Sequence, residues 1–141
     1  GFLNPVEETT LTIPSTATKV ITVGAYDARF DQAAAFSGRG YTRATNQVKP
    51  DLVAPGGEIM SCAPGGGYQV RTGTSMATPF VTGSAALLMQ WGIVNGNDAY
   101  LYGEKMKAYL IRGARKLPGF TVYPNPVLGW GALCTANSIP R

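Results

Sequence analysis

The segment at residues 73–79, Gly-Thr-Ser-Met-Ala-Thr-Pro, constrains this chain most, because it joins a strand pattern directly to a helix pattern. Residues 68–72 alternate in the manner of a short strand. Residues 80–91 contain no proline and are apolar on most sides, which predicts a buried helix. Ser75 is therefore expected to lie where the strand turns into the helix.

Ser75 has two interpretations at this turn. A serine before an apolar helix is commonly a helix cap. It can also be a nucleophile, because unpaired backbone N–H groups and the positive end of a helix dipole favour a negative oxygen nearby, and its own N–H can help to hold an oxyanion. Gly73 permits the tight turn, and Pro79 is expected in the first helical turn, where its missing N–H costs little. The spacing alone leaves both interpretations open.

The composition disfavours several functional classes. The 141 residues suffice for one domain, and 45% hydrophobic with 14% charged residues is typical of a folded globular protein. The net charge is +4, but the basic residues are scattered and form no stripe among aromatic residues, so no nucleic-acid partner is expected. The longest apolar stretch, near residues 85–89, is too short to cross a bilayer, so no membrane partner is expected.

Cysteine and histidine usage narrows the chemistry further. Cys62 and Cys134 are too few for a disulfide framework or a metal cluster, and each is expected to be a small buried hydrophobic residue. The three glycines at 65–67 lack the following residues of a phosphate-binding loop. The chain contains no histidine, so a Ser–His–Asp triad cannot be assembled from it alone. No metal and no cofactor are expected.

Other segments predict the remaining elements. Residues 1–18 are typical of a surface loop, and residues 19–25 of a buried parallel strand. Residues 52–54 and 59–62 are expected to be short strands, the second forming a hairpin with residues 68–72. Asp98 is expected to cap a second helix that runs to about Gly113.

The string at 73–79, followed by Val81 and Gly83, resembles the nucleophile segment of the subtilisin-like serine peptidases, the subtilase family. Residues 20–25, 36–40, 50–56 and 129–131 resemble further segments of that family in the same order. The resemblance extends from about residue 12 to about residue 136. The strings at 37–43 and 87–93 look most like peptidases of anaerobic spore-forming bacteria.

This resemblance implies a three-layer α/β fold with a mostly parallel sheet, of which residues 1–141 form the C-terminal half of a catalytic domain. It implies that Ser75 is the nucleophile of a serine endopeptidase acting on polypeptides. Ser75 N–H would support the oxyanion and Thr74 would flank its pocket, with simple capping as the alternative for Thr74. In the family the catalytic Asp and His and the oxyanion Asn precede this region, so the fragment alone is expected to be inactive. The resemblance also implies a secreted, cell-surface or spore-associated protein.

Two other functional classes remain as alternatives. One is a non-catalytic subtilisin-like scaffold or signalling protein, against which the intact serine segment argues. The other is a stand-alone binding domain, which is disfavoured because the apolar strands and helix would lack their usual partners. We expect the strand at 19–25 and the helix at 80–91 to be covered by the N-terminal half of the same protein or by a second copy of the chain.

The resemblance also yields two local expectations. Pro14 falls where many relatives have a cis-proline, so the Ile13–Pro14 bond is expected to be cis. Many relatives bind a weak cation with carbonyls of the following loop and two acidic residues. Asp51 matches one acid, whereas Lys49 occupies the other position. A lysine ammonium can fill such a carbonyl-lined spot, so no Ca²⁺ is expected there.

Overall fold

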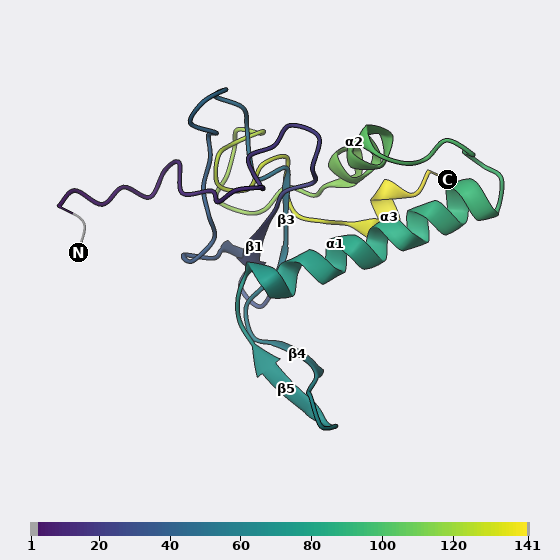
Figure 1. Ribbon diagram of the computed structural model, residues 1–141, viewed down its shortest axis with the longest axis horizontal. Coiled ribbons are helices and arrows are strands. Elements are labelled where there is room, and N and C mark those ends of the chain that lie inside the picture. The colour runs from purple at the N-terminus through teal and green to yellow at the C-terminus, as the bar shows by residue number, and fades with distance from the viewer. Residues whose placement is uncertain (1–2, 141) are drawn as a thin grey trace.

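The computed structural model describes residues 3–140, which form a small mixed sheet, a separate hairpin and helices gathered on one side (Figure 1). In chain order the elements are β1 (Val23–Asp27), β2 (Gln32–Ala33), β3 (Leu52–Pro55), β4 (Ile59–Cys62), β5 (Tyr68–Arg71), α1 (Thr74–Met89), a π-helical turn (Gln90–Val94), α2 (Glu104–Gly113) and α3 (Thr135–Ser138).

The central sheet has the order β2-β1-β3, with β1 and β3 parallel. β2 pairs antiparallel with β1 only at Tyr26 and Asp27. The strand predicted at 19–25 is therefore present but begins at Val23. The physical reason lies at Thr22, whose N–H donates to the Asp51 carboxylate at 2.7 Å, so a side chain replaces the strand ladder at this point.

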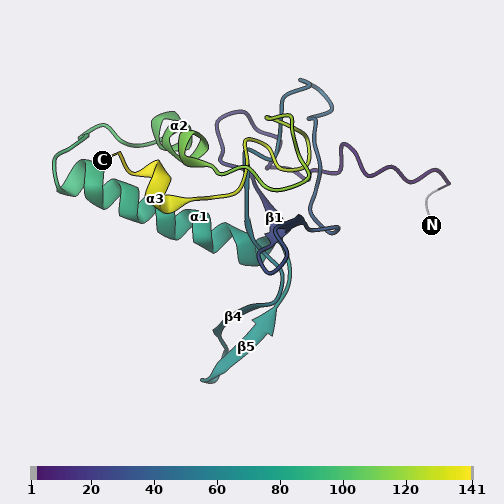
Figure 2. The same ribbon diagram turned by 180° about the vertical axis from the view of Figure 1, so that it is seen from behind.

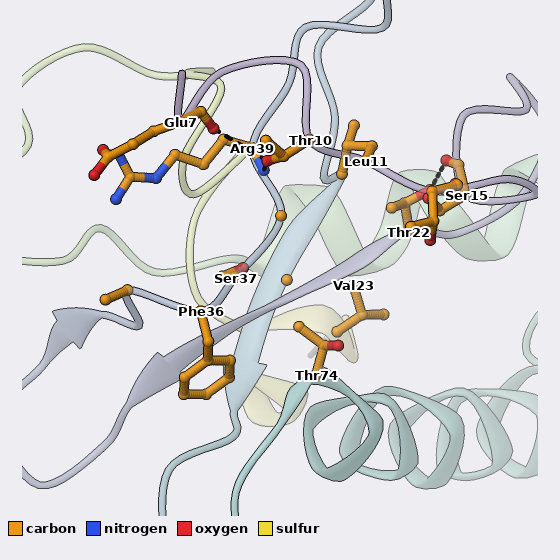
Figure 3. Close-up of a pocket in the computed structure, with 14 residues that line it drawn as sticks. Glu7, Thr10, Leu11, Ser15, Thr22, Val23, Phe36, Ser37, Arg39 and Thr74 are labelled. Carbon is orange, nitrogen blue, oxygen red and sulfur yellow. Dashed lines mark hydrogen bonds and ion pairs between the residues drawn. The ribbon is translucent and has the colours of Figure 1, made fainter. Parts of the chain in front are cut away.

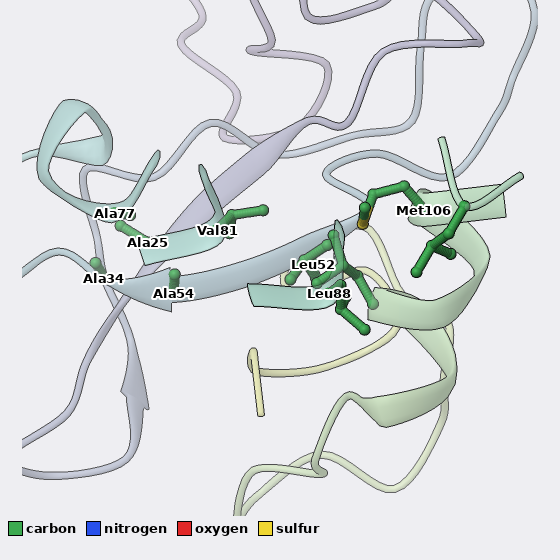
Figure 4. Close-up of a cluster of buried hydrophobic side chains, with 10 residues drawn as sticks. Ala25, Ala34, Leu52, Ala54, Ala77, Val81, Leu88 and Met106 are labelled. Atoms are coloured by element: carbon green, nitrogen blue, oxygen red, sulfur yellow. The ribbon is translucent and has the colours of Figure 1, made fainter. Parts of the chain in front are cut away.

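The alternation of side chains along β1 and β3 builds two hydrophobic clusters, one on each face of the sheet. The cluster on the α1 face joins residues of both strands to α1 and α2 (Figure 4): Ala25, Leu52, Ala54, Ala77, Val81, Leu88, Met106 and Leu110 are among its buried members. On the other face, Tyr26 and Val53 pack against Leu117, Leu128 and Ala132, which belong to loop segments. The segment around Ala132 also adds a parallel bridge to Val53, which extends the sheet.

α1 is buried on one face only. Ala77, Val81 and Leu88 are buried, whereas Phe80 and Leu87 are 42% and 52% exposed. The prediction of a buried helix is therefore correct for the sheet-facing side alone. The opposite face of α1 is apolar and exposed at these residues.

The same helix corrects the expectation that the longest apolar stretch of the chain is too short to cross a bilayer. Together with the π-helical turn, α1 gives a 21-residue apolar helix, Thr74–Val94, which is long enough to cross a membrane by length and composition. The estimate from residues 85–89 was wrong because small residues such as Gly83 and Ser84 do not interrupt the apolar run. Since α1 packs on β1 and β3, we interpret it as a core helix.

β4 and β5 form an antiparallel hairpin that projects from the body of the molecule (Figures 1 and 2). Gly65, Gly66 and Gly67 in its turn all have positive φ, between 77° and 101°, a region that glycine enters without a Cβ clash. The hairpin prediction is thus confirmed. Cys62 ends β4 and is exposed, and Cys134 is only half-buried, so the expectation that both are buried was wrong.

α2 begins later than predicted, at Glu104, after Gly103 in the cap position. Asp98 does not cap it. Its carboxylate instead accepts from Lys105 Nζ at 2.6 Å and from Tyr109 Oη at 3.0 Å, so it braces the outside of the helix. The hydrogen bond from Lys105 is the main reason why the pKa of Asp98 lies below its usual value.

The segment before β1 follows its prediction. Residues 3–18 contain no helix or strand and are mostly exposed, as expected of a loop. The Ile13–Pro14 peptide bond is cis, which confirms that expectation.

Candidate active site

Ser75 is the second residue of α1, in the turn that connects β5 to the helix. Gly73 holds the cap position with φ 154° and ψ 165°, a conformation that a residue with a Cβ rarely adopts. Met76 N–H donates to Gly73 O at 3.0 Å, which closes the first turn. Ser75 is therefore not the helix cap, and its residue is exposed.

The start of α1 offers a favourable environment for a negative oxygen. Ser75 N–H lies in the first turn, where the residue four positions back, Arg71, belongs to β5 and not to the helix. The first turn contains no acidic residue that would neutralise the positive end of the helix dipole. This arrangement can hold an oxyanion next to the Ser75 hydroxyl.

Pro79 lies further inside α1 than predicted, beyond the first turn. Because proline has no N–H, it cannot donate to the carbonyl four residues earlier, which is that of Ser75. The helix therefore omits one internal hydrogen bond directly at the candidate nucleophile. The expectation of a first-turn proline was wrong because the helix starts at Thr74.

Contacts to the end of β3 fix the turn before Ser75. Gly73 N–H donates to Gly56 O at 2.9 Å, and Gly56 N–H donates to Tyr26 O at 3.0 Å. Glu58 N–H donates to the Thr72 hydroxyl at 2.9 Å. The loop that follows β3 thus binds both Thr72 and Gly73, and it connects the turn before Ser75 to the central sheet.

An arginine clamp holds this loop from outside. Arg29 donates to Asp27 from Nε at 3.0 Å and from Nη2 at 2.5 Å, and its Nη1 pairs with Glu58. The hydrogen bond from the Arg29 side chain is the main cause that lowers the pKa of Asp27 to about 2. The clamp therefore stays charged over the ordinary pH range.

Ser75 lines a cavity of about 330 Å³ between α1 and the hairpin. Its other walls are mainly apolar: Ile59, Met60, Ser61, Met76, Pro79 and Phe80. A serine hydroxyl on the wall of an apolar cavity, beside free backbone donors, is chemically suited to attack a bound carbonyl group.

Thr74 lines a different cavity, of about 450 Å³, on the side of the N-terminal segment (Figure 3). Val23, Ser37 and Arg39 also border it, and Arg39 pairs there with Glu7. The neighbouring residues Thr74 and Ser75 thus face separate cavities. Gly73, and not Thr74, holds the cap position of α1, so the capping alternative for Thr74 is wrong.

Most of the acidic residues are engaged with basic side chains away from Ser75. Within residues 3–140, six carboxylates form ion pairs with Arg or Lys, and none of these pairs includes a residue of α1: Glu7, Asp27, Asp31, Asp51, Glu58 and Asp98. The described part of the chain also has no group of three or more potential metal-ligating His, Cys, Asp or Glu side chains. The six ion-paired carboxylates are therefore each engaged with a basic side chain and not with Ser75.

The Lys49 ammonium lies at a backbone carbonyl, as the sequence predicted. Its ammonium is buried and donates to Val20 O at 2.9 Å and to Asp51 Oδ2 at 2.7 Å. A second ammonium, that of Lys107 on α2, lies 2.8 Å from Asp51 Oδ1 and donates to Thr18 O and Val20 O. Burial lowers the pKa of Lys49, and the hydrogen bond to Asp51 opposes this effect.

We expect the melting temperature of the protein to be the same in calcium as in chelator, because two ammonium groups already satisfy Asp51 and the Val20 carbonyl. A cation there would face like charges at close range. Differential scanning fluorimetry in millimolar CaCl₂ and in EDTA measures this. A calcium-dependent rise that disappears in Asp51→Ala would contradict the expectation.

Sequence reasoning missed two features of the site. It did not place Lys107 in the cluster with Asp51, because these residues are far apart in the chain. It also did not find the cavity beside Ser75, although the alternation in 59–62 and 68–71 puts Ile59, Ser61 and Arg71 on one face of the hairpin. That alternation was the available signal.

Comparison with known proteins gives a consistent result. The profile described as the Subtilase family matches residues 4–131. The serine protease AprX of Bacillus subtilis is 34% identical over 93% of this chain and 32% of its own length. An intracellular serine protease of Paenibacillus polymyxa is 46% identical over 55% of this chain and 21% of its own. The chain thus spans about a fifth to a third of these curated relatives.

Solved structures agree. The CspB protease of Clostridium perfringens is 47% identical with a TM-score of 0.91, over 96% of this chain and 29% of that one. The patellamide maturation protease PatA is 28% identical with a TM-score of 0.73, over 94% of this chain and 46% of that one. The expected subtilisin-like α/β fold is therefore confirmed for the part that this chain represents, with a small mixed sheet and helices.

Proposed function

The chain belongs to the subtilase family of serine peptidases, and on this premise we propose that Ser75 is the nucleophile of a serine endopeptidase in the full-length protein. The observation that carries the proposal is the placement of Ser75. It is exposed in the first turn of α1, next to free backbone donors and on the wall of a cavity. The proposed substrate is a polypeptide.

The remaining catalytic groups come, in this proposal, from polypeptide outside residues 1–141. The chain has no histidine, and its relatives AprX and CspB are about three times as long as the matched region. A serine hydroxyl needs a base to become a good nucleophile at neutral pH. The family resemblance assigns that base to a His, held by an Asp, and assigns a second oxyanion donor to an Asn.

The reaction then proceeds by acyl transfer. Ser75 Oγ bonds to the substrate carbonyl carbon while its proton moves to the His, and the carbonyl electrons move onto the oxygen. Ser75 N–H and the Asn amide stabilise that oxyanion, with Thr74 beside them. When the carbonyl re-forms, the C–N bond breaks and the His returns the proton to the leaving amine. Water then hydrolyses the ester and restores the Ser75 hydroxyl.

A fluorophosphonate probe tests this function directly, because it reacts covalently with activated serine hydroxyls. We expect the full-length protein to be labelled on Ser75, as identified by peptide mass spectrometry. Labelling should require the native fold and should be absent after denaturation. A native, folded protein that is not labelled would favour the alternative of a non-catalytic scaffold with the same fold.

The proposal also concerns partners. β2 covers only the end of β1, so within residues 3–140 the start of β1 has a strand partner on the β3 side alone. α1 has an exposed apolar face that includes Phe80 and Leu87. We propose that another part of the same protein covers these surfaces, with a second copy of the chain as the alternative.

We expect purified residues 1–141, expressed alone, to associate or to remain bound to another polypeptide, because an open sheet edge and an apolar helix face favour pairing. Light scattering together with intact-mass analysis measures this. Addition of the remaining part of the protein should suppress self-association. A monodisperse monomer of 14.9 kDa with a cooperative melt would contradict the expectation.

A further inference from the structure

A second cavity, of about 300 Å³, adjoins the one that Ser75 lines. It is bordered by Ile59, Ser61, Cys62, Pro64, Gln69, Arg71 and Met76. Ile59, Ser61 and Met76 border both cavities. The two cavities are therefore neighbours with three walls in common; Ser75 lines the first and Arg71 lines the second.

The register of the hairpin explains why Arg71 faces the second cavity. Ile59 pairs with Arg71 and Ser61 pairs with Gln69, so these side chains lie on one face of the hairpin. Met60 and Val70 form the intervening pair on the opposite face, and Met60 borders the cavity of Ser75 but not that of Arg71. Four residues after Arg71, the chain has turned into α1 and reached Ser75.

The guanidinium of Arg71 is held in place without being neutralised. With the Gln69 amide oriented so that its oxygen faces Arg71, Gln69 Oε1 accepts from Arg71 Nε at 3.0 Å and from Nη2 at 2.9 Å. None of the ion pairs within residues 3–140 involves Arg71. An arginine has five N–H donors in a planar fork, so donors remain that can bind a carboxylate.

We propose that Arg71 selects an acidic side chain of the peptide substrate close to the scissile bond. The inference rests on the proposed peptidase function of Ser75. A peptide whose carbonyl lies at Ser75 can place a neighbouring side chain past Met76 into the cavity of Arg71. A carboxylate there meets a positioned guanidinium, and such charge-assisted hydrogen bonds are stronger than neutral ones.

The test uses the full-length protein and quenched fluorescent peptides that are identical except at the positions flanking the scissile bond. Each of these positions carries in turn Glu, its neutral isostere Gln, or Lys. We expect kcat/KM for Glu to exceed that for Gln by about tenfold at one position. Arg71→Gln should bring this ratio close to one, Arg71→Lys should retain part of it, and Arg71→Glu should favour the Lys peptide.

Arg112→Gln is the matched control, because Arg112 is an exposed arginine on α2, away from the hairpin (Figure 1). It should retain the acidic preference in full. Cleavage without any Glu-to-Gln preference, or a preference that survives in Arg71→Gln, would overturn this inference and leave the peptidase function intact. If no peptide is cleaved and fluorophosphonate does not label Ser75, the peptidase function itself fails, and the inference fails with it.

Discussion

Residues 1–141 alone are expected not to cleave peptides, and the full-length protein is expected to lose turnover when Ser75 is replaced by alanine. Both results follow from one physical requirement. The nucleophile needs a base, and this chain supplies the hydroxyl, the free N–H and the helix dipole but no histidine. For Ser75→Ala we expect a loss of kcat on the order of 10⁴-fold or more, as is usual when a triad nucleophile is removed.

Thr82→Ala is a suitable control on the same helix. The Thr82 hydroxyl is exposed, and it donates only to Thr78 O at 3.2 Å. This variant should keep nearly all of the activity, because it changes a helix hydroxyl without touching the cavity of Ser75. Kinetics with a fluorogenic peptide measure both variants. Robust hydrolysis by the purified fragment, lost in Ser75→Ala, would disprove the view that the site is divided between this chain and another segment.

Asp51→Asn is expected to lower the free energy of unfolding of the full-length protein by about 3–5 kcal/mol. Asp51 is the one carboxylate between two ammonium groups, and its side chain is only 5% exposed. An amide keeps the shape but removes the negative charge, which leaves the Lys49 ammonium buried without a counter-charge. The Thr22 N–H also loses a charged acceptor at 2.7 Å.

Two further variants test whether the loss of stability in Asp51→Asn comes from the buried charge of Lys49. Asp31→Asn breaks the pair of Asp31 with Arg115, in which both side chains are more than a third exposed. It should cost at most about 1 kcal/mol. Lys49→Met removes the buried ammonium but leaves Lys107 on Asp51, so it should cost less than Asp51→Asn. Urea unfolding with linear extrapolation measures all three. Equal, small losses in Asp51→Asn and Asp31→Asn would contradict the argument.

The sequence alone predicted the features that depend on neighbouring residues. Gly73 marked the turn, the alternation at 59–62 and 68–71 predicted the hairpin, and the string at 73–79 identified the family. The position of the Lys49 ammonium at a backbone carbonyl was also predicted, from the lysine that replaces the second acidic residue. Such features need only local backbone preferences or a short motif, and both are visible in the order of residues.

The tertiary structure decided what depends on distant residues. Asp98 looks like a cap by its position, but Lys105 and Tyr109 bind its carboxylate and α2 begins later. Lys107 reaches Asp51 only because α2 packs beside the segment before β1. The cavities of Arg71 and Ser75 are neighbours only because the hairpin meets α1. Periodicity shows which residues share a face of an element, but packing alone determines what that face meets.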